Sequence, residues 1–371
     1  MGELTSRERL IKTFKGEETD RIPTYDILHN KDLIEFATGQ KITPENAEDL
    51  LCKTANKYLD LIRHFTVPDY EGEKIIREDD GFIYRYEWWT GCILERPVLK
   101  TVDDVRRMVE KDIEIIKDCT LNKKICYVAN NHVNLFYEKF EYFEEICAEY
   151  ERITEKLNGT VMLGPEMIMA HSAAFFRYGF DLWTFFINDY PEIAREYINS
   201  FYSYNIAMAD SYIELDTMPI VCTAGSIGTD DRLLYNPDFY KEVIIPEEIK
   251  LYKKFKSRGK YIIAFLDGYK LPILNDFINA GVDAIDPFEP YCKMNVKKFR
   301  EEYPDVVICQ PIDCTQLLPF GSENEVRDAT IKAIEDAGKK KILIGSSSEI
   351  HPNIKISNAI IMYETARNYI L

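Results

Sequence analysis

The chain has no excess of basic residues. It carries 46 Lys and Arg against 63 Asp and Glu, which gives a formal net charge of -17 at pH 7. A continuous basic surface is therefore not expected, and this argues against nucleic acid and anionic membranes as partners. No hydrophobic run approaches the roughly 18 residues that a membrane-spanning helix needs. No low-complexity stretch or linker divides the sequence, so a single domain over residues 1–371 is the simplest organisation.

Paired cysteines are also lacking. The first nine residues contain no apolar segment of the kind found in a signal peptide. The cysteines are scattered without a CxxC pair, at Cys52, Cys92, Cys119, Cys126, Cys147, Cys222, Cys292, Cys309 and Cys314. We expect a reduced, cytoplasmic protein with free thiols.

The C-terminal third contains hydrophobic runs that each end in polar residues. Runs at 261–265, 284–285, 306–309 and 342–344 lead respectively into Asp267, into Asp286 and Glu289, into Asp313, and into Ser347, Ser348 and Glu349. Helical stretches separate them, and this repeated order is typical of a (β/α) barrel, whose active site lies at the C-terminal ends of the strands. The polar residues at the end of any single strand, here called a strand tip, are as well explained by a turn or a helix cap. Four in succession favour a shared site.

The remaining sequence extends the same pattern. Thr5 and Glu8 have the spacing of a capping box and predict an N-terminal helix that ends near Gly16. Residues 31–63 are predicted to be helical, and the aromatic segment within 65–100 predicts a β-hairpin excursion over the rim. Candidate strands near 21, 125, 160, 218, 260, 283, 306 and 341 make eight. The fold class is therefore α/β, a single (β/α)8 TIM barrel with an N-terminal helical extension.

Several segments resemble the uroporphyrinogen decarboxylase superfamily. They are the opening at 6–16 with Asp20-Arg21-Ile22-Pro23, the strand at 281–287, the segment 312–321 followed by Glu325, and the last tip at 345–352. The resemblance spans nearly the whole chain, is strong over 215–371 and weaker over 65–150, and implies one (β/α)8 barrel. The superfamily contains porphyrinogen decarboxylases and corrinoid-dependent methyltransferases, so the motifs specify the fold more tightly than the reaction.

The chain departs from both of these patterns. Decarboxylases share an RQAGRY segment after the first strand, where this chain reads Tyr25-Asp26-Ile27-Leu28-His29-Asn30 without an Arg, and their late His is Ser348 here. The coenzyme M methyltransferases resemble one another in a zinc site whose ligand positions align with Phe265, Asp267 and Ser348. Because zinc prefers thiolate and imidazole ligands, this site is not expected. A different zinc site is left open, with Asp267, Glu289, Cys292, Cys309 and Cys314 as candidate ligands.

The polar tips define a candidate site rich in carboxylates. Several carboxyl groups in one cleft cannot all ionise easily, so some are expected to have raised pKa values and to donate protons. Asp267 is favoured because Gly268 beside it allows close approach of a ligand. The candidate catalytic residues are Tyr25, His29, Asp231, Asp267, Glu289 and Asp313. The candidate substrate-binding residues are Trp88, Glu166, Asp230, Ser347, Ser348 and Glu349.

These observations favour a corrinoid-dependent methyltransferase. It would move a methyl group from a small donor, preferably a methoxylated aromatic, to the cobalamin of a separate corrinoid protein. A carboxylic acid, Tyr25, His29 or a metal would assist departure of the ether oxygen by protonating or coordinating it. The first alternative is a decarboxylase, for which Arg232 and Arg177 are the candidate anchors of substrate carboxylates. The second is a barrel that binds ligands without catalysis. Trp88 and Trp89 would cover an aromatic substrate, lie in an oligomer contact or belong to the local core, so a homodimer is left open.

Overall fold

Short parallel strands form a closed barrel in the computed structural model, which describes residues 2–63, 65, 71–130 and 140–371. The barrel strands are β1 (Tyr25–Asp26), β2 (Leu61–Ile62), β6 (Val161–Met162), β7 (Glu166–Ile168), β8 (Ile220–Ser226), β9 (Tyr261–Asp267), β10 (Ala284–Asp286), β11 (Val307–Cys309) and β12 (Ile342–Leu343). β6 pairs with β2 and β7 pairs with β8, so these two pieces act as one barrel strand interrupted at Gly164 and Pro165. A parallel bridge between Thr24 and Ile344 joins β1 to β12 and closes the barrel. The predicted (β/α)8 barrel is confirmed.

The second strand is not where the sequence predicted it. Residues 125–128 lead into the short helix α5 (Tyr127–Asn130), and the strand beside β1 is instead Leu61–Ile62. That pair of residues ends the stretch predicted to be helical. The preceding helix stops at Tyr58, and Leu59 already has extended backbone angles. A short apolar run does not distinguish a helix end from a buried strand, which explains the error.

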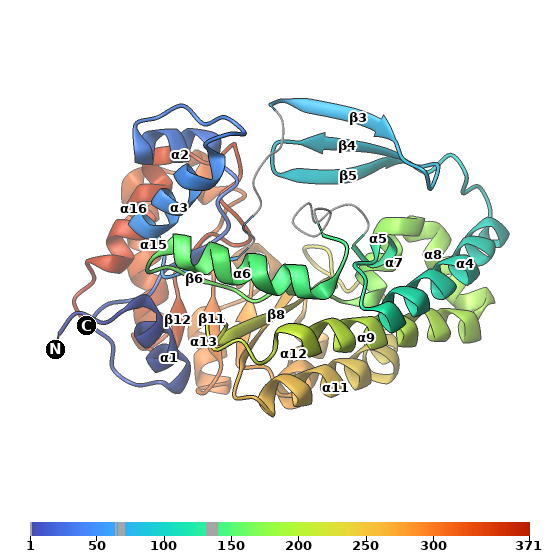
Figure 1. Cartoon of the computed structure of the whole chain (residues 1–371). Coiled ribbons are helices and arrows are strands. Elements are labelled where there is room, and N and C mark those ends of the chain that lie inside the picture. Colours follow the sequence, from blue (N-terminus) through green and yellow to red (C-terminus); the bar gives the residue numbers. More distant parts are fainter. Residues whose placement is uncertain (1, 64, 66–70, 131–139) are drawn as a thin grey trace.

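Helices surround the barrel (Figure 1). Those longer than one turn are α1 (Ser6–Lys15), α2 (Lys31–Thr38), α3 (Ala47–Tyr58), α4 (Val102–Asn122), α6 (Phe143–Leu157), α7 (Ala170–Tyr178), α8 (Phe180–Asp189), α9 (Pro191–Tyr212), α11 (Ile245–Lys256), α12 (Leu271–Ala280), α13 (Val296–Glu302), α15 (Glu323–Asp336) and α16 (Ile356–Arg367). None of the helices in the described residues combines the length and apolarity that crossing a bilayer requires.

Helix α1 packs against the inside of the barrel at its N-terminal end. Thr5 and Glu8 form the predicted capping box, and Gly16 ends the helix in a left-handed conformation. Leu10 and Phe14 join the hydrophobic cluster of inward-facing strand residues, and the Phe14 ring lies 4.8 Å from that of Tyr261. Because α1 fills this end with apolar side chains, polar chemistry inside the barrel is confined to the opposite, C-terminal end.

The predicted hairpin excursion is a three-stranded antiparallel sheet that stands apart from the barrel (Figure 1). It consists of β3 (Glu73–Arg77), β4 (Ile83–Glu87) and β5 (Thr90–Glu95), and Trp88 and Trp89 form the turn between the last two strands. A buried ion cluster anchors the sheet. Arg177 of α7 contacts Asp80 at 3.3 Å and Asp112 of α4 at 2.6 Å. Arg177 is thereby occupied, so the prediction that it anchors a substrate carboxylate is wrong.

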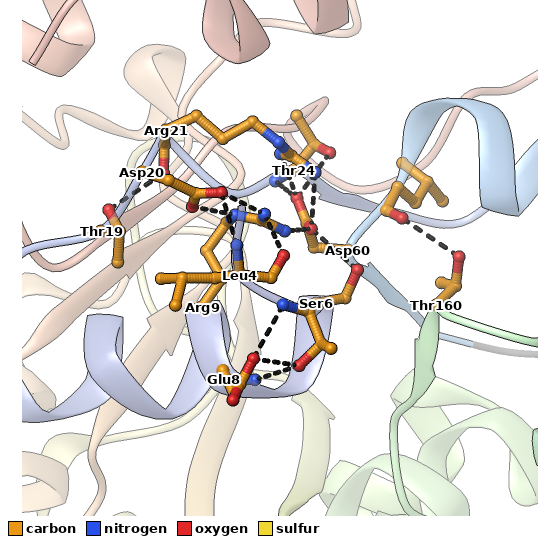
Figure 2. A network of polar contacts seen from close by, with 12 residues as sticks. Leu4, Ser6, Glu8, Arg9, Thr19, Asp20, Arg21, Thr24, Asp60 and Thr160 are labelled. Atoms are coloured by element: carbon orange, nitrogen blue, oxygen red, sulfur yellow. Dashed lines mark hydrogen bonds and ion pairs between the residues drawn. The ribbon is translucent and has the colours of Figure 1, made fainter. Parts of the chain in front are cut away.

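A second buried network joins α1 to the start of β1 and β2 (Figure 2). The Arg9 guanidinium contacts Asp20 at 2.7 Å and Asp60 at 2.5 Å, and Arg21 contacts the other oxygen of Asp60 at 2.6 Å. Arg9 and Asp60 are 2% and 0% exposed. Burial tends to raise the pKa of the Asp60 carboxyl, but Arg21 and Arg9 hold it below its usual value. The network therefore depends on Asp60 being charged.

Replacing Asp60 with Asn is expected to destabilise the protein by about 3–5 kcal/mol, because the buried Arg9 and the partly buried Arg21 lose their shared counter-charge. The free energy of unfolding from urea denaturation measures this effect. The control is Asp216→Asn, which removes the partner of Arg7 where Asp216 is 97% exposed. An exposed pair contributes about 0–1 kcal/mol. Equal losses in the two variants would contradict the structural role of the buried network.

Candidate active site

The inward-facing residues at the C-terminal ends of the strands are polar. Side chains alternate along a strand, so the inward positions of β9 are Ile263, Phe265 and Asp267, and that of β10 after Ala284 is Asp286. Ile263 and Ala284 belong to the barrel's inner hydrophobic cluster, and Phe265 packs against it. The last inward residues of β9 and β10 are therefore acidic, while the residues below them form the apolar interior.

Arg63 occupies the centre of this layer. It directly follows β2 and is 4% exposed. Its Nε donates to Glu166 at 2.9 Å, its Nη1 lies 3.8 Å from Asp286, and its guanidinium carbon lies 3.6 Å from the centre of the Phe265 ring. Burial tends to lower the pKa of the guanidinium, but the Glu166 charge raises it well above its ordinary value. Arg63 is thus a permanent cation, and Nη1 makes no hydrogen bond within the described residues.

Asp286 is the most strongly perturbed carboxyl group beside Arg63. It is fully buried, and one of its oxygens accepts a hydrogen bond of 3.0 Å from the Tyr25 hydroxyl. Burial raises the pKa of Asp286 to about 7, against the opposing effects of Arg63 and Tyr25. Its other oxygen, Oδ1, has no hydrogen-bond partner among the described residues. A carboxyl group with this pKa and a free oxygen can supply a proton near neutral pH.

Asp267 and Glu289 lie together at the ends of β9 and β10. Ser226 donates to Asp267 at 3.3 Å, and burial with the nearby Glu289 charge raises the pKa of Asp267 to about 6. Glu289 accepts from Lys270 at 2.8 Å, Tyr291 at 2.7 Å and the backbone of Gly268 at 3.0 Å. Its role as a catalytic acid is therefore not supported, because its oxygens already accept these bonds, whereas Asp267 keeps the expected raised pKa.

Glycine is required at position 268 for a reason other than close approach of a ligand. A Cβ atom at this position would lie 2.1 Å from the carbonyl oxygen of Gly228, and the residue has a φ of +90°. Both facts require glycine, because the strand end passes directly against the loop after β8. The argument from Gly268 for Asp267 as a functional residue is therefore wrong, and the case for Asp267 depends on its burial and pKa.

His29 and Glu349 form a pair at the junction of the first and last strands. The His29 Nδ1 atom lies 2.7 Å from Glu349, and the imidazole stacks on Trp89 with ring centres 6.1 Å apart. Trp88 stacks on Trp89 in turn at 5.4 Å. Through Trp89, the predicted residues His29 and Glu349 are thus connected to Trp88 in the β4–β5 turn.

Other predicted residues have structural roles. Asp313 accepts hydrogen bonds from the backbone N–H and the hydroxyl of Thr315 at 2.7 Å within its own turn, so it stabilises a turn, while Gln316 is the N-cap of the next helix. The Ser347 hydroxyl accepts from the backbone of Cys314 at 3.1 Å, and the Ser348 carbonyl accepts from Gln310 at 3.2 Å. These contacts position the last strand tip and leave no evidence that the three residues bind substrate.

The loop after β8 is separate from the buried layer. Asp230 and Asp231 are exposed, and Asp231 contacts Arg232, whose side chain is 77% exposed, at 3.2 Å. Neither aspartate is buried with the acids described above, so the catalytic role predicted for Asp231 is not supported. Arg232 likewise does not anchor a ligand inside the barrel.

The candidate zinc ligands do not converge. Within the described residues, no group of three or more His, Cys, Asp or Glu side chains is placed to hold a metal ion. Burial raises the pKa of Cys292 to about 12 and that of Cys314 to about 11, and it raises that of Cys309 well above the usual value. Protonated thiols are poor metal ligands. The residues present therefore do not fit a zinc site.

The sequence analysis missed Arg63, Lys270 and the role of Asp286. Arg63 was hidden because residues 31–63 were predicted to be helical, which removed it from the set of strand tips. Lys270 is 0% exposed and was overlooked because a lysine three residues after a strand is usually solvated. Asp286 was named only among the polar residues that follow a strand, and it was given no catalytic role. Asp26 of β1 is also buried, with a pKa raised to about 7, and it accepts hydrogen bonds from Ser346 and Tyr363.

Comparison with known proteins agrees with the fold. A family model described as uroporphyrinogen decarboxylase (URO-D) matches residues 120–369. The chain belongs to this family. The matched region contains β6 to β12, and so includes Glu166, Asp267 and Asp286. A methyltransferase from Methanosarcina mazei has a similar structure over 98% of both chains, with a TM-score of 0.68 and 15% identity. At this identity the likeness shows the fold alone. A search of curated proteins gave no match.

Proposed function

We propose that this member of the URO-D family transfers a methyl group from a small methylated donor, preferably a methoxylated aromatic, to the cobalamin of a separate corrinoid protein. The observation that carries the proposal is Asp286, a buried carboxyl group with a pKa of about 7, whose Oδ2 lies near Arg63 and whose Oδ1 has no hydrogen-bond partner among the described residues. The corrinoid supplies the nucleophile that takes the methyl group. This chain supplies the site that binds the donor and the proton for its oxygen.

The departure of the ether oxygen is the step that this site assists. When the methyl–oxygen bond breaks, its electron pair stays on oxygen, and protonated Asp286 provides the proton that makes the leaving group a neutral phenol. Tyr25 stabilises the carboxylate that remains. The free Nη1 of Arg63 offers a further hydrogen bond to the same developing charge. The Phe265 ring and Glu166 hold the guanidinium in one orientation.

The charges of the site support this reaction over decarboxylation of a polycarboxylate. Such a substrate needs cations that are free to bind carboxylates. Arg63 is paired with Glu166, and Lys270 is paired with Glu289 at 2.8 Å. Asp267, Asp286 and Glu349 add further acidic groups at the same end of the barrel. A neutral donor therefore fits the site better than an anion with several charges.

The test is an anaerobic assay of methyl transfer. The purified protein is mixed with cob(I)alamin and a panel of methoxybenzenes and methylamines, and the cobalt absorption spectrum is followed. We expect methylation of cobalt with a methoxylated aromatic and release of the corresponding phenol. The assay is repeated with a corrinoid protein as acceptor, because free cobalamin lacks the protein surface that docks at the barrel. Absence of transfer with every donor and both acceptors would reject the proposal, and tight binding of a polycarboxylate tetrapyrrole would then favour decarboxylation.

A further inference from the structure

The pair formed by His29 and Glu349 is held by backbone pairing beyond the barrel. β1 and β12 continue past their regular ends, where Leu28 and Ile350 form a parallel bridge. The His29 N–H donates to the Ile350 carbonyl at 3.1 Å, and the Ile350 N–H donates to the Ile27 carbonyl at 2.9 Å. This register places Glu349 beside His29, so the position of the imidazole is set by two strands.

The contact with Glu349 determines which imidazole nitrogen faces a ligand. A carboxylate only accepts hydrogen bonds, so Nδ1 of His29 carries the hydrogen at 2.7 Å from Glu349. Nε2 is then the atom left for another partner. A histidine oriented by a carboxylate in this way is a common arrangement at binding and catalytic sites.

Nε2 is buried without a partner. His29 is 9% exposed, and Trp89, which stacks on it, is 6% exposed. Within the described residues, neither Nε2 of His29 nor Nε1 of Trp89 makes a hydrogen bond. Buried polar atoms are rarely left without a hydrogen bond, so two of them on stacked rings require an explanation. The transfer of the methyl group itself uses neither atom.

We propose that His29 and Trp89 bind an acidic hydroxyl group of the methyl donor, so that the preferred substrates are methoxyphenols. This inference depends on the proposed function for the identity of the donor. A hydroxyl group donates to Nε2 of His29 and accepts from the indole N–H of Trp89, so it satisfies both atoms. A phenolic O–H is a stronger hydrogen-bond donor than that of an aliphatic alcohol, so a phenol suits the Nε2 acceptor.

The surroundings of the pair favour a phenol over a carboxylate or an aliphatic alcohol. The Glu349 carboxylate already lies beside the His29 ring, so a substrate carboxylate at Nε2 would bring a second negative charge close to the first. Trp89 and Trp88 stack at 5.4 Å and offer an aromatic surface to a ring. The hydroxyl group and the methyl ether would then contact different parts of the mouth, with the ether oxygen at Asp286.

The first measurement is binding without a corrinoid, which does not depend on methyl transfer. Calorimetric titrations compare methoxyphenol isomers with the matching dimethoxybenzenes and methoxybenzoates. We expect at least one methoxyphenol to bind about 10- to 100-fold more tightly than its dimethoxy counterpart, as for a hydrogen bond to a charged or strongly polar group. Equal affinity for the two, or preference for the benzoate, would overturn the inference.

Two variants of the pair test the role of Nε2. His29→Phe keeps an aromatic ring against Trp89 but removes the nitrogen, and it should abolish the preference for the hydroxyl group while leaving binding of dimethoxybenzenes within about 3-fold. Glu349→Gln still accepts from Nδ1 and should retain part of the preference. If His29→Phe keeps the full preference, the inference is wrong even where methyl transfer is observed. If the preference is present but no donor is demethylated, the proposed function fails and the binding site stands.

Discussion

Replacing Asp286 with Asn should lower kcat for methyl transfer about 10²- to 10⁴-fold, the range expected for loss of a positioned proton donor. Asn has nearly the same shape and can still accept from Tyr25, but it cannot protonate the leaving oxygen. Donors that depart without needing a proton, such as quaternary methylamines, should lose much less activity. Steady-state kinetics with both donor classes measures this difference. An equal loss for both would show that Asp286 is needed for structure or binding instead.

Asp286→Asn is expected to lower activity but to raise the stability of the folded protein. The pKa of Asp286 is raised to about 7 in the folded protein from its ordinary 3.8, so the folded state binds the proton more tightly than the unfolded state. Its contribution to stability is present at low pH and is lost as the pH rises from about 4 to about 7. Asn does not ionise, so Asp286→Asn should gain stability relative to the natural protein over this interval. Urea denaturation at pH 5 and pH 8 tests the sign.

Replacing Arg63 with Met should reduce activity on the order of 10³-fold, because it removes a fixed donor to the developing charge and leaves Glu166 without its buried partner. Arg63→Lys should recover little, since an ammonium group cannot both pair with Glu166 and direct a second donor toward Asp286. The expected loss is in kcat/KM for all donors. Activity close to that of the natural protein in Arg63→Met would remove Arg63 from the site.

A matched control separates this effect from general destabilisation. Arg177 is as deeply buried as Arg63 and contacts Asp112 at 2.6 Å, but it belongs to the anchor of the β3–β5 sheet. Arg177→Met should lower the free energy of unfolding by a similar amount, about 3–5 kcal/mol. The molecules that remain folded should keep most of their activity. A comparable loss of kcat/KM in both variants would indicate that the losses arise from unfolding.

The sequence predicted the location of the site, because the C-terminal ends of the strands in a parallel barrel meet at one end. Tyr25, Glu166 and Asp267 were named from this rule; Asp267 ends β9, whereas Tyr25 lies in β1 and Glu166 begins β7 beyond the break after β6. The rule does not distinguish a side chain that faces inward from one that satisfies its own turn. Asp313 has the same sequence context as Asp267, yet its carboxylate accepts from Thr315. Only backbone direction and burial separate the two.

The sequence by itself determined the barrel, its N-terminal helix, the excursion and the acidic character of the mouth, because hydrophobic periodicity and capping residues act locally. The tertiary structure alone decided which acids are buried, which cations are already paired and which polar atoms are left without partners. Arg63 meets Glu166 across 103 positions of sequence, and Tyr25 meets Asp286 across 261. Such pairs arise from closure of the barrel, and desolvation and charge depend on neighbours that local patterns do not specify.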